Sequence, residues 1–429
     1  MTYPPNCSGT SDNSSNKVAH QIFIKQAEML CSGAELLPNG TEELARRLQK
    51  ATESNQPLNI KLGLDPTRPD LHLGHAVVLK KLRLFQDLGH QAILIIGDAT
   101  AMIGDPSGKS ATRPALSEEA VNQNAETYLA QAGKIIDVEK ASIVRNSQWL
   151  SEMNLASFLK LAAHATVAQI IARDDFAKRL SEKKPISLHE LFYPLMQGYD
   201  SVMVNADLEL GGTDQRFNNL MGRALQQAYD SKPDSQLVLL MPLLEGTDGK
   251  IKMSKSYPDH CINLTDLPNE MFGKIMSIPD PLITRYELLL GLLTQEQVSQ
   301  QEQQLASGQI NPRDLKLWLA KFLIRIYYGE TEAETAEQYF INTFQKKDIP
   351  DTMDEIALSA AQAVDLVKVL VENGLAPSRN EARRLIQGGG VKVDSEKVAA
   401  IDRQLHASPA DSTVIQVGKR KFLKIVWTQ

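Results

Sequence analysis

Two histidines separated by Leu73 and Gly74 open a stretch of helical periodicity that follows the apolar run Leu58–Leu64. At this spacing His72 and His75 share a face of the first helical turn, where free N–H groups and the positive helix end attract phosphate. Both imidazoles can donate hydrogen bonds to phosphate oxygens, and the glycine lets a flat base approach the backbone. The pattern predicts a nucleotide site. Two surface histidines, or the start of a metal site, are the alternatives, but no third metal ligand of the right type stands nearby, so we expect no protein-held metal.

A second candidate is the run Lys252-Met-Ser-Lys255-Ser256, which follows the glycine-containing segment 246–250. The glycines favour a mobile loop, and two lysines three residues apart suit a transient clamp on a polyphosphate. Such a clamp stabilises most strongly the charge that develops on a leaving pyrophosphate. A solvated surface loop is the usual reading of such a run, but the histidine motif favours the functional one.

The segment Gly104–Ser110 resembles a phosphate-binding P-loop, but it has three residues between its glycines where a P-loop has four. Pro106 also removes an N–H group that a phosphate cradle would need. We therefore predict a turn after a strand at this segment and no P-loop.

Three polar residues recur at helical spacing in the middle of the chain. Tyr193, Gln197 and Asp200 stand at positions i, i+4 and i+7, so one helix face presents all three. A polar face packed on solvent is the alternative to a binding site.

The elements that must position these residues alternate in type. Helical stretches separate short apolar runs, which lie at Leu58–Leu64, Ala92–Gly97, Ser142–Val144, Val202–Leu210 and Leu237–Leu240. This alternation predicts an α/β domain with a parallel sheet covered on both faces, over residues 18–257. Ligands bind such sheets at the carboxyl ends of the strands. Residues 1–17, rich in Pro, Ser, Asn and Gly, read as a disordered tail and not as a signal peptide.

Helices without strands are expected over residues 258–350. The clearest runs from Asn311, its N-cap, to Gly329, and its apolar positions predict a core-facing stripe. These positions are Leu315, Trp318, Leu319, Phe322, Leu323 and Ile326.

A linker, expected at residues 346–363, leads to a small unit at residues 360–429. A helix capped by Ser378 and ended by Gly388 should precede strands at Val391–Val393, Val414–Val417 and Phe422–Trp427. From residue 360 onward 11 Lys and Arg stand against 7 Asp and Glu, a local charge of +4 in a chain of net charge −6. This basic unit is a candidate RNA-binding domain, although a mildly basic ordinary domain is the alternative.

Composition excludes several classes. The 429 residues are 42% hydrophobic and 23% charged, which argues against wholesale disorder. No apolar run approaches the roughly 18 residues of a membrane-spanning helix. Three cysteines without a CxxC motif fit a reducing cytosol better than a disulfide framework, so we expect a cytoplasmic protein.

The paired HxGH and KMSKS motifs on an α/β domain resemble the signature of class I aminoacyl-tRNA synthetases. Within that class, nearly everything from about residue 30 onward resembles bacterial tyrosyl-tRNA synthetases. The stretches that carry this resemblance are Gly63-Leu-Asp65-Pro-Thr67, Ile103-Gly-Asp105-Pro-Ser-Gly108, Tyr193-Pro-Leu-Met-Gln197-Gly-Tyr-Asp200, Leu210-Gly-Gly212-Thr-Asp214-Gln215 and Lys252–Ser256.

The resemblance implies an α/β class with a Rossmann-like parallel-sheet catalytic domain, an all-helical domain that bears on the anticodon arm, and a small α+β RNA-binding domain. It also implies a tyrosine–tRNA ligase that uses ATP as a substrate with Mg²⁺, acts on tRNA(Tyr) and forms a homodimer. The reaction would have two steps, formation of tyrosyl-adenylate and transfer of tyrosine to the 3′ end of the tRNA. No editing domain would be needed, because a buried partner of the phenolic hydroxyl rejects the analogue that lacks it, a rule for which tyrosyl-tRNA synthetases are themselves the standard example.

Residue roles follow from the resemblance alone. Tyr193, Gln197 and Asp105 would hold the substrate α-amino group, and Asp200 would accept the phenolic hydroxyl. The rest of the amino-acid pocket would be formed by Gln215, Asp65, Thr100 and Asn146. The ATP site would be formed by Gly63, Asp65, Gly74, Gly212, Asp214 and Met253, with Gly212 and Asp214 at the ribose. The groups acting on the phosphates would be Thr67, His72, His75, Lys252 and Lys255.

One position departs from the family's commonest pattern. Lys61 stands where a tyrosine usually helps to bind the phenol, and we leave it out of the predicted pocket. Three alternatives remain open at this point: a tryptophanyl-tRNA synthetase, a small-molecule adenylyltransferase with an HxGH motif, and a non-enzymatic RNA-binding scaffold.

Overall fold

The structure is a computed structural model that describes residues 12–107, 116–254, 257–345, 353–360, 363–407, 412–418 and 421–428. The chain forms two compact units, residues 1–333 and 334–429, which we describe one at a time. A search of the described residues for a helix long and apolar enough to cross a membrane finds none.

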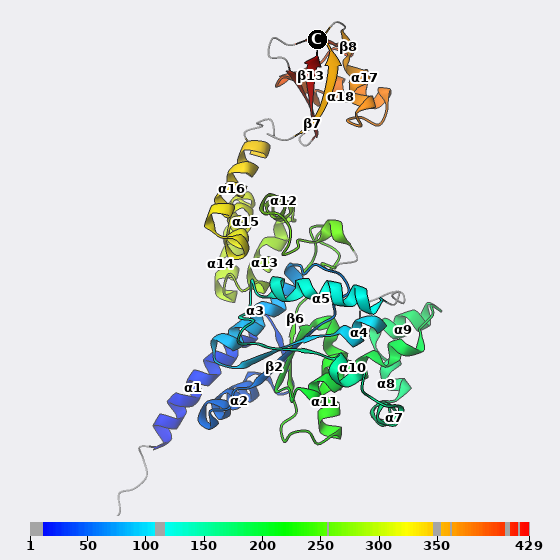
Figure 1. The fold of residues 1–429 in the computed structure, drawn as a ribbon. Coiled ribbons are helices and arrows are strands. Elements are labelled where there is room, and N and C mark those ends of the chain that lie inside the picture. The colour runs from blue at the N-terminus through cyan, green and yellow to red at the C-terminus, as the bar shows by residue number, and fades with distance from the viewer. Residues whose placement is uncertain are drawn as a thin grey trace, which may run out of the picture. The chain divides into compact units, whose positions relative to one another are not determined.

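A six-stranded sheet forms the centre of the first unit, with the strand order β1-β6-β5-β2-β3-β4. Five strands run parallel, and only the short edge strand β1 is antiparallel to its neighbour β6. The strands are β1 (Glu35–Leu37), β2 (Asn59–Leu64), β3 (Gln91–Ile96), β4 (Ser142–Arg145), β5 (Leu208–Gly212) and β6 (Leu237–Met241). The predicted parallel α/β sheet is therefore confirmed (Figure 1).

The helices of this sheet region contact the strands and one another. Helix α3 packs on β3 and β5, and α11 packs on β5, β6 and α10. The helices are α1 (Asp12–Cys31), α2 (Gly40–Ser54), α3 (Leu73–Asp87), α4 (Asp98–Ile103), α5 (Glu118–Ala132), α6 (Ser147–Leu150), α7 (Leu155–Ala162), α8 (Val167–Ile171), α9 (Asp174–Ser181), α10 (Tyr193–Met203) and α11 (Arg216–Ala228), with short 3₁₀ turns η1 (Leu188–Leu191) and η2 (Thr213–Gln215).

Three local predictions need correction. Helix α1 begins at Asp12, so residues 12–17 are helical and not the tail that their composition predicts. The apolar run Val202–Leu210 is not one strand, because α10 ends at Met203 and a left-handed residue, Asn205, turns the chain before β5. Gly104 follows helix α4, not a strand, and Gly108–Ser110 lie outside the described residues.

Helices also dominate the chain from residue 258 to 345, as predicted. They are η3 (Pro258–His260), α12 (Pro268–Met276), η4 (Asp280–Leu282), α13 (Ile283–Leu289), α14 (Gln295–Ala306), α15 (Pro312–Tyr328), α16 (Glu330–Phe340) and the π-helical turn η5 (Ile341–Gln345). The Asn311 side chain accepts a hydrogen bond from the Arg313 N–H, which confirms the predicted N-cap of α15.

The predicted apolar stripe of α15 is only partly buried. Leu319 and Leu323 are fully buried, whereas Trp318 is 40% exposed and stacks on Phe322 at a centroid distance of 4.9 Å. Ile326 is also exposed. The stripe read from the sequence is thus wider than the face that packs into the core.

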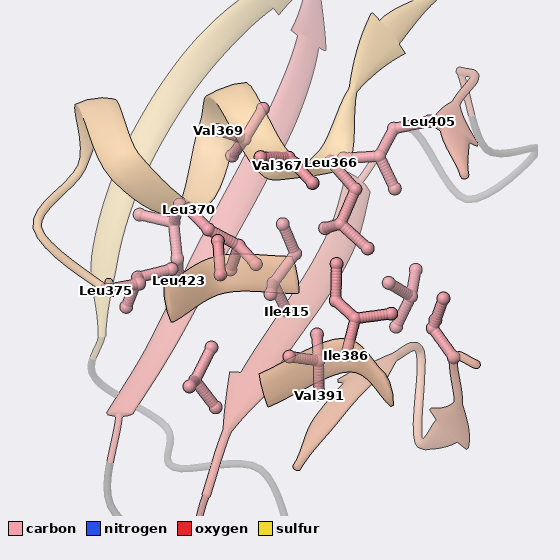
Figure 2. Close-up of a cluster of buried hydrophobic side chains, with 14 of the residues drawn as sticks. Leu366, Val367, Val369, Leu370, Leu375, Ile386, Val391, Leu405, Ile415 and Leu423 are labelled. Carbon is pink, nitrogen blue, oxygen red and sulfur yellow. The ribbon is translucent and has the colours of Figure 1, made fainter. Parts of the chain in front are cut away.

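Besides the end of α16 and the turn η5, the described residues of the second unit form a five-stranded sheet of order β10-β9-β12-β13-β7, a two-stranded sheet β11-β8 and two further helices. Its elements are β7 (Asp354–Ser359), β8 (Val364–Asp365), α17 (Leu366–Glu372), α18 (Arg379–Gln387), β9 (Val391–Val393), β10 (Glu396–Lys397), β11 (Gln404–Leu405), β12 (Ser412–Val417) and β13 (Lys421–Thr428). Side chains from both helices and the strands, including Leu370, Ile386 and Ile415, form one buried cluster (Figure 2).

Strand β7 corrects the predicted linker. Residues 354–359 pair in parallel with β13 along its length, so they belong to the sheet and not to a linker before residue 360. The sequence hid this strand because it contributes only partly buried side chains at the edge of the sheet. The predicted helix cap is confirmed, since the Ser378 hydroxyl accepts a hydrogen bond from the Glu381 N–H at 3.3 Å.

Candidate active site

A cavity of about 260 Å³ opens at the carboxyl ends of the parallel strands in the first unit. Sixteen of the residues predicted from the sequence line it: Gly63, Asp65, Thr67, His72, Gly74, His75, Thr100, Asp105, Tyr193, Gln197, Asp200, Gly212, Asp214, Gln215, Lys252 and Met253. The histidine motif and the start of the lysine run, about 180 residues apart in the chain, therefore face one and the same cavity.

Of the two remaining predicted residues, one is described and does not line the cavity. Asn146 is fully buried behind it, where its side-chain N–H₂ lies 3.3 Å from Asp200 Oδ2 and 3.0 Å from Thr100 Oγ1. Lys255 lies outside the described residues.

The histidines stand at the start of α3, as predicted. The backbone N–H of His72, the N-cap, donates to Nδ1 of His75 at 3.2 Å, and the two ring centroids are 4.0 Å apart. A Cβ atom on Gly74 would stand 3.0 Å from the His72 ring. The glycine therefore leaves room for the His72 ring at the positive end of the helix, where an anion is favoured.

The lysine run begins on backbone that is bonded to the segment just after β6. The Met253 N–H donates to the Leu244 carbonyl at 2.7 Å, and the backbones of Lys252 and Glu245 form an isolated antiparallel β-bridge. The Lys252 ammonium lies 2.6 Å from Asp214 Oδ2, a residue that follows β5. A positive charge thus stands at the same end of the cavity as the histidine motif, since a Cβ atom on Gly74 would lie 4.0 Å from Met253 Cβ.

The opposite end of the cavity is buried and acidic. Asp65 accepts hydrogen bonds from the Tyr193 hydroxyl and the Thr100 hydroxyl, both at 2.8 Å. Burial, with the nearby negative charge of Asp105, raises the pKa of Asp65 to about 7. A substrate ammonium placed here would favour the carboxylate, because an opposite charge within a few ångströms stabilises the ionised form.

Asp200 sits deeper in the same region. Its Oδ1 accepts the indole N–H of Trp149 at 2.8 Å, and its Oδ2 accepts from Asn146. Burial raises the pKa of Asp200 to about 7, while the charge of Lys61 and the two hydrogen bonds act in the opposite direction. The two donors leave carboxylate lone pairs for a third donor from the cavity.

A network of amides joins the middle of the cavity. The Gln215 side chain donates to Asp105 at 2.8 Å, and Asn218 donates to the side-chain oxygen of Gln197 at 2.8 Å. Buried Arg173 donates in turn to Asn218. These bonds orient the polar groups that face the cavity.

Sequence reasoning missed Trp149 and Asn218. Asn146 directly follows β4, and Trp149 stands three residues after it. Asn218 likewise stands three residues after Gln215, one helical turn further on. Each spacing places the missed residue beside a predicted one, and this signal was available in the sequence.

The arrangement suits a substrate with two different ends. Carboxylates at the buried end match an ammonium group and a hydrogen-bond donor, and the imidazoles and ammonium at the open end match phosphates. The cavity joins these ends, so it can hold an amino acid against a nucleotide.

Comparison with known proteins agrees with this geometry. Residues 52–345 match the family "tRNA synthetases class I (W and Y)", and residues 343–425 match the "Tyrosine--tRNA ligase SYY-like C-terminal domain". The tyrosine–tRNA ligase of Carboxydothermus hydrogenoformans is 50% identical over 408 residues, which cover 94% of this chain and 98% of the relative. That of Thermotoga maritima is 49% identical over 384 residues, covering 90% of this chain and 93% of the relative.

Solved structures share the fold at lower identity. A C-terminally truncated mitochondrial tyrosyl-tRNA synthetase from Aspergillus nidulans has a TM-score of 0.59 at 19% identity and covers 76% of this chain and 98% of its own. The Archaeoglobus fulgidus tyrosyl-tRNA synthetase, solved with L-tyrosine, has a TM-score of 0.57 at 23% identity and covers 73% of this chain and 99% of its own. Because a family match over most of the chain is joined by curated relatives at about half identity, this chain belongs to the tyrosine–tRNA ligase family of class I tRNA synthetases.

Proposed function

We propose that the chain activates tyrosine with ATP in this cavity and then transfers the tyrosyl group to the 3′ end of tRNA(Tyr). The observation that carries the proposal is the single cavity that His72, His75 and Lys252 share with Asp200 and Tyr193. This is the activity of the family to which the chain belongs. We also place it in the cytoplasm, where translation uses charged tRNA.

In the first step, a carboxylate oxygen of tyrosine attacks the α-phosphorus of ATP and pyrophosphate leaves with its bonding electron pair. The chain supplies no covalent nucleophile in this proposal, and catalysis comes from positioning and charge. His72, His75 and Thr67 donate to the phosphates, while Lys252 and Lys255 neutralise the leaving pyrophosphate. Gly212 and Asp214 hold the ribose, and the backbone at Gly63, Gly74 and Met253 lies against the nucleotide.

The tyrosine itself would lie at the buried end. Asp105, Gln197 and Tyr193 hold its ammonium group, with Asp65 as a further carboxylate held in place by Tyr193 and Thr100. Asp200 accepts the phenolic hydroxyl and is oriented by Asn146. A tryptophan substrate has an N–H donor too, but the curated relatives at about half identity are tyrosine–tRNA ligases.

Mg²⁺ would enter with ATP, held by phosphate oxygens and water, as this ion prefers. Among the described residues no group of three or more His, Cys, Asp or Glu side chains is arranged to hold a metal ion. When bound, it would neutralise part of the phosphate charge.

The assay that tests the proposal is amino-acid-dependent exchange of pyrophosphate into ATP with a panel of amino acids. Tyrosine should support exchange, and tryptophan and phenylalanine should not. Charging of tRNA(Tyr) then separates a tRNA ligase from a small-molecule adenylyltransferase. Absence of tyrosine-dependent exchange in well-folded protein would contradict the proposal.

The second unit would bind the tRNA through backbone contacts that weaken with salt. Helix α18 presents Arg379, Arg383 and Arg384, which supports this role. A chain that ends at residue 345 lacks the whole second sheet, since β7 begins at Asp354. It should keep tyrosine–ATP exchange but lose tRNA charging, and intact charging would contradict the RNA-binding role.

A homodimer is also proposed. The short helices α7, α8 and η1 carry large apolar side chains in water, with Leu155 73% exposed and Leu188 69% exposed. Large apolar side chains that are exposed to this degree favour an interface, and a second copy of the chain would cover them. Sedimentation of the wild type should show a dimer, and the double variant Leu155→Glu/Leu188→Glu should be a monomer. Ile401→Glu, at an exposed apolar position of the other unit, is the control and should leave the dimer intact. A monomeric wild type would contradict this part.

A further inference from the structure

Lys61, the one position that departs from the family's commonest pattern, is fully buried in β2 and does not line the cavity. Its ammonium lies 2.8 Å from Glu209 Oε1 on β5. It also donates to the Gln197 carbonyl at 2.9 Å and to the Ser201 hydroxyl at 2.7 Å. All three N–H donors of the ammonium are therefore used.

Two of these three acceptors belong to the turn of α10 that carries the pocket. Gln197 and Ser201 stand on either side of Asp200 in the helix, and Gln197 and Asp200 both face the cavity. Glu209 is itself held by the Gln236 side chain and Ser201. Lys61 thus connects the central strand to the helix turn that recognises the substrate.

Several charged and titratable groups surround Asp200. Lys61 on β2 favours its ionised form, whereas Glu209 on β5 opposes it. From the segment after β2, Asp65 interacts with it, and from its own helix so does Tyr193. The β4–α6 corner contributes only neutral donors, the indole of Trp149 and the amide of Asn146. Of the described groups that act on Asp200, Lys61 is therefore the one that carries a positive charge.

A buried ion pair is a weak source of stability, because desolvation of both charges offsets their attraction. An apolar pair would fill the same space between β2 and α10. The placement of an ammonium here is better explained by what it does to the neighbouring helix turn than by stability.

We propose that Lys61 is a positioning residue for tyrosine selectivity, which fixes the Gln197–Ser201 turn of α10 and favours the ionised form of Asp200 as the acceptor for the phenolic hydroxyl. The inference rests on the proposed function. A carboxylate accepts this hydrogen bond strongly, whereas a protonated carboxyl group offers a weaker neutral partner. Without the hydroxyl, phenylalanine leaves the buried carboxylate unpaired and is rejected.

The direction of the pH effect follows from the surroundings. Burial already raises the pKa of Asp200 to about 7, and the positive charge of Lys61 lowers it. Removing that charge raises the pKa further, so a larger fraction of Asp200 is protonated at neutral pH. Selectivity for tyrosine should then appear only at higher pH.

The test is the ratio of kcat/KM for tyrosine to kcat/KM for phenylalanine in pyrophosphate exchange, measured from pH 6 to pH 9. The ratio cancels the titration of Asp65, because both amino acids carry the same ammonium group. Variants are Lys61→Met and the double variant Lys61→Met/Glu209→Gln, which leaves no unpaired buried charge. Lys81→Met is the matched control, because Lys81 is a buried lysine of α3 that donates to the Ser32 carbonyl and does not line the cavity.

We expect the pH at which the ratio is half-maximal to rise by about one unit in Lys61→Met, and the ratio at pH 7 to fall about fivefold. The rise should be smaller in the double variant, because loss of the Glu209 charge offsets part of the effect. The KM for tyrosine should rise while kcat at saturating tyrosine changes little. Lys81→Met should keep the wild-type profile. Should Lys61→Met fail to fold, the double variant decides.

An unchanged pH profile in the folded double variant would overturn the inference, and so would a profile that shifts equally in Lys81→Met. A double variant that cannot fold would also overturn it, because Lys61 would then serve the fold alone. In each of these cases wild-type exchange with tyrosine would remain. Loss of tyrosine-dependent exchange in the wild type would instead contradict the proposed function.

Discussion

The two ends of the cavity are built differently. At the amino-acid end, Asp65 follows a strand, Tyr193 and Asp200 stand on a helix, and hydrogen bonds fix all three side chains. Tyr193 and Asp200 are also buried. At the phosphate end, Lys252 is 28% exposed and is held by one ion pair to Asp214. One end is rigid and desolvated, and the other carries charge on a loop.

This difference separates two tasks. Buried polar groups discriminate between substrates, because a wrong substrate leaves them unpaired in a low dielectric. Charges that can move contribute most when new charge develops, as on a leaving pyrophosphate. The Lys252–Asp214 pair must loosen for the ammonium to reach a phosphate, so we expect substitutions at the two ends to change different kinetic constants.

The largest effect should come from the buried end. Asp200→Ala removes the charged acceptor of the phenol, and it also removes the carboxylate to which Trp149 and Asn146 donate. The tyrosine-to-phenylalanine ratio of kcat/KM in the exchange assay should fall by about 10⁴-fold. This is the scale on which such sites reject the analogue that lacks the hydroxyl, and this enzyme family is the standard example. Asp266→Ala, which removes a buried aspartate outside the cavity lining, is the control. A ratio that survived in Asp200→Ala would assign the hydroxyl to another partner.

A smaller effect of a different kind is expected at the open end. Lys252→Ala should slow adenylate formation about 10²- to 10³-fold, since a charged contact made in the transition state is worth about 3–4 kcal/mol. The Kd of tyrosine should not change. Lys250→Ala, at an exposed lysine of the same loop, should be close to wild type in single-turnover measurements. If Lys252→Ala weakened tyrosine binding instead, the two ends would not be separate.

Local spacing explains how far the sequence predicted this site. His72 with His75, and Tyr193 with Asp200, lie within one or two helical turns, so their shared faces could be read from the chain. That the histidines and Lys252 face one cavity depended on the order of the strands. Parallel strands end at one edge, and this rule was enough to bring distant motifs together.

Long-range side-chain partners were not predictable in the same way. Lys61 looked like a charge within an apolar strand, and its partner Glu209 lies on a strand 148 residues away. The Lys252–Asp214 pair likewise depends on how the loop after β6 approaches the end of β5. Edge strand β7 and the exposed Trp318 were misread because partial burial leaves little trace in a hydrophobic pattern.

The rigid end should also cost stability in a pH-dependent way. The pKa of Asp200 is about 7 in the folded chain and ordinarily 3.8, so between these values the folded state holds a proton that the unfolded state has lost. Stability therefore falls as pH rises through this window. Asp200→Asn removes this pH-dependent loss. The free energy of unfolding of the variant relative to wild type should therefore improve by about 2 kcal/mol from pH 5 to pH 8. The difference in Tm between variant and wild type at each pH checks this expectation.

Glu287 provides the matched comparison outside the cavity. Burial raises its pKa to about 7, and its carboxylate accepts a hydrogen bond from Gln301. Glu287→Gln should show the same sign of pH dependence in Tm but keep full tyrosine exchange, whereas Asp200→Asn should lose exchange. An Asp200→Asn variant whose Tm difference from wild type did not change with pH would contradict the raised pKa.

The smallest effect should come from one neutral hydroxyl at the rigid end. Thr100→Val keeps the side-chain shape and removes the donor 2.8 Å from Asp65 Oδ1. Because this hydrogen bond favours the carboxylate that faces the substrate ammonium, its loss should raise the KM for tyrosine about fivefold, equivalent to about 1 kcal/mol. Tyrosine and phenylalanine should be affected equally, since both present the same ammonium group to Asp65. A change in their ratio would mean that the ammonium and hydroxyl contacts are coupled through Asn146, which donates to both Thr100 and Asp200.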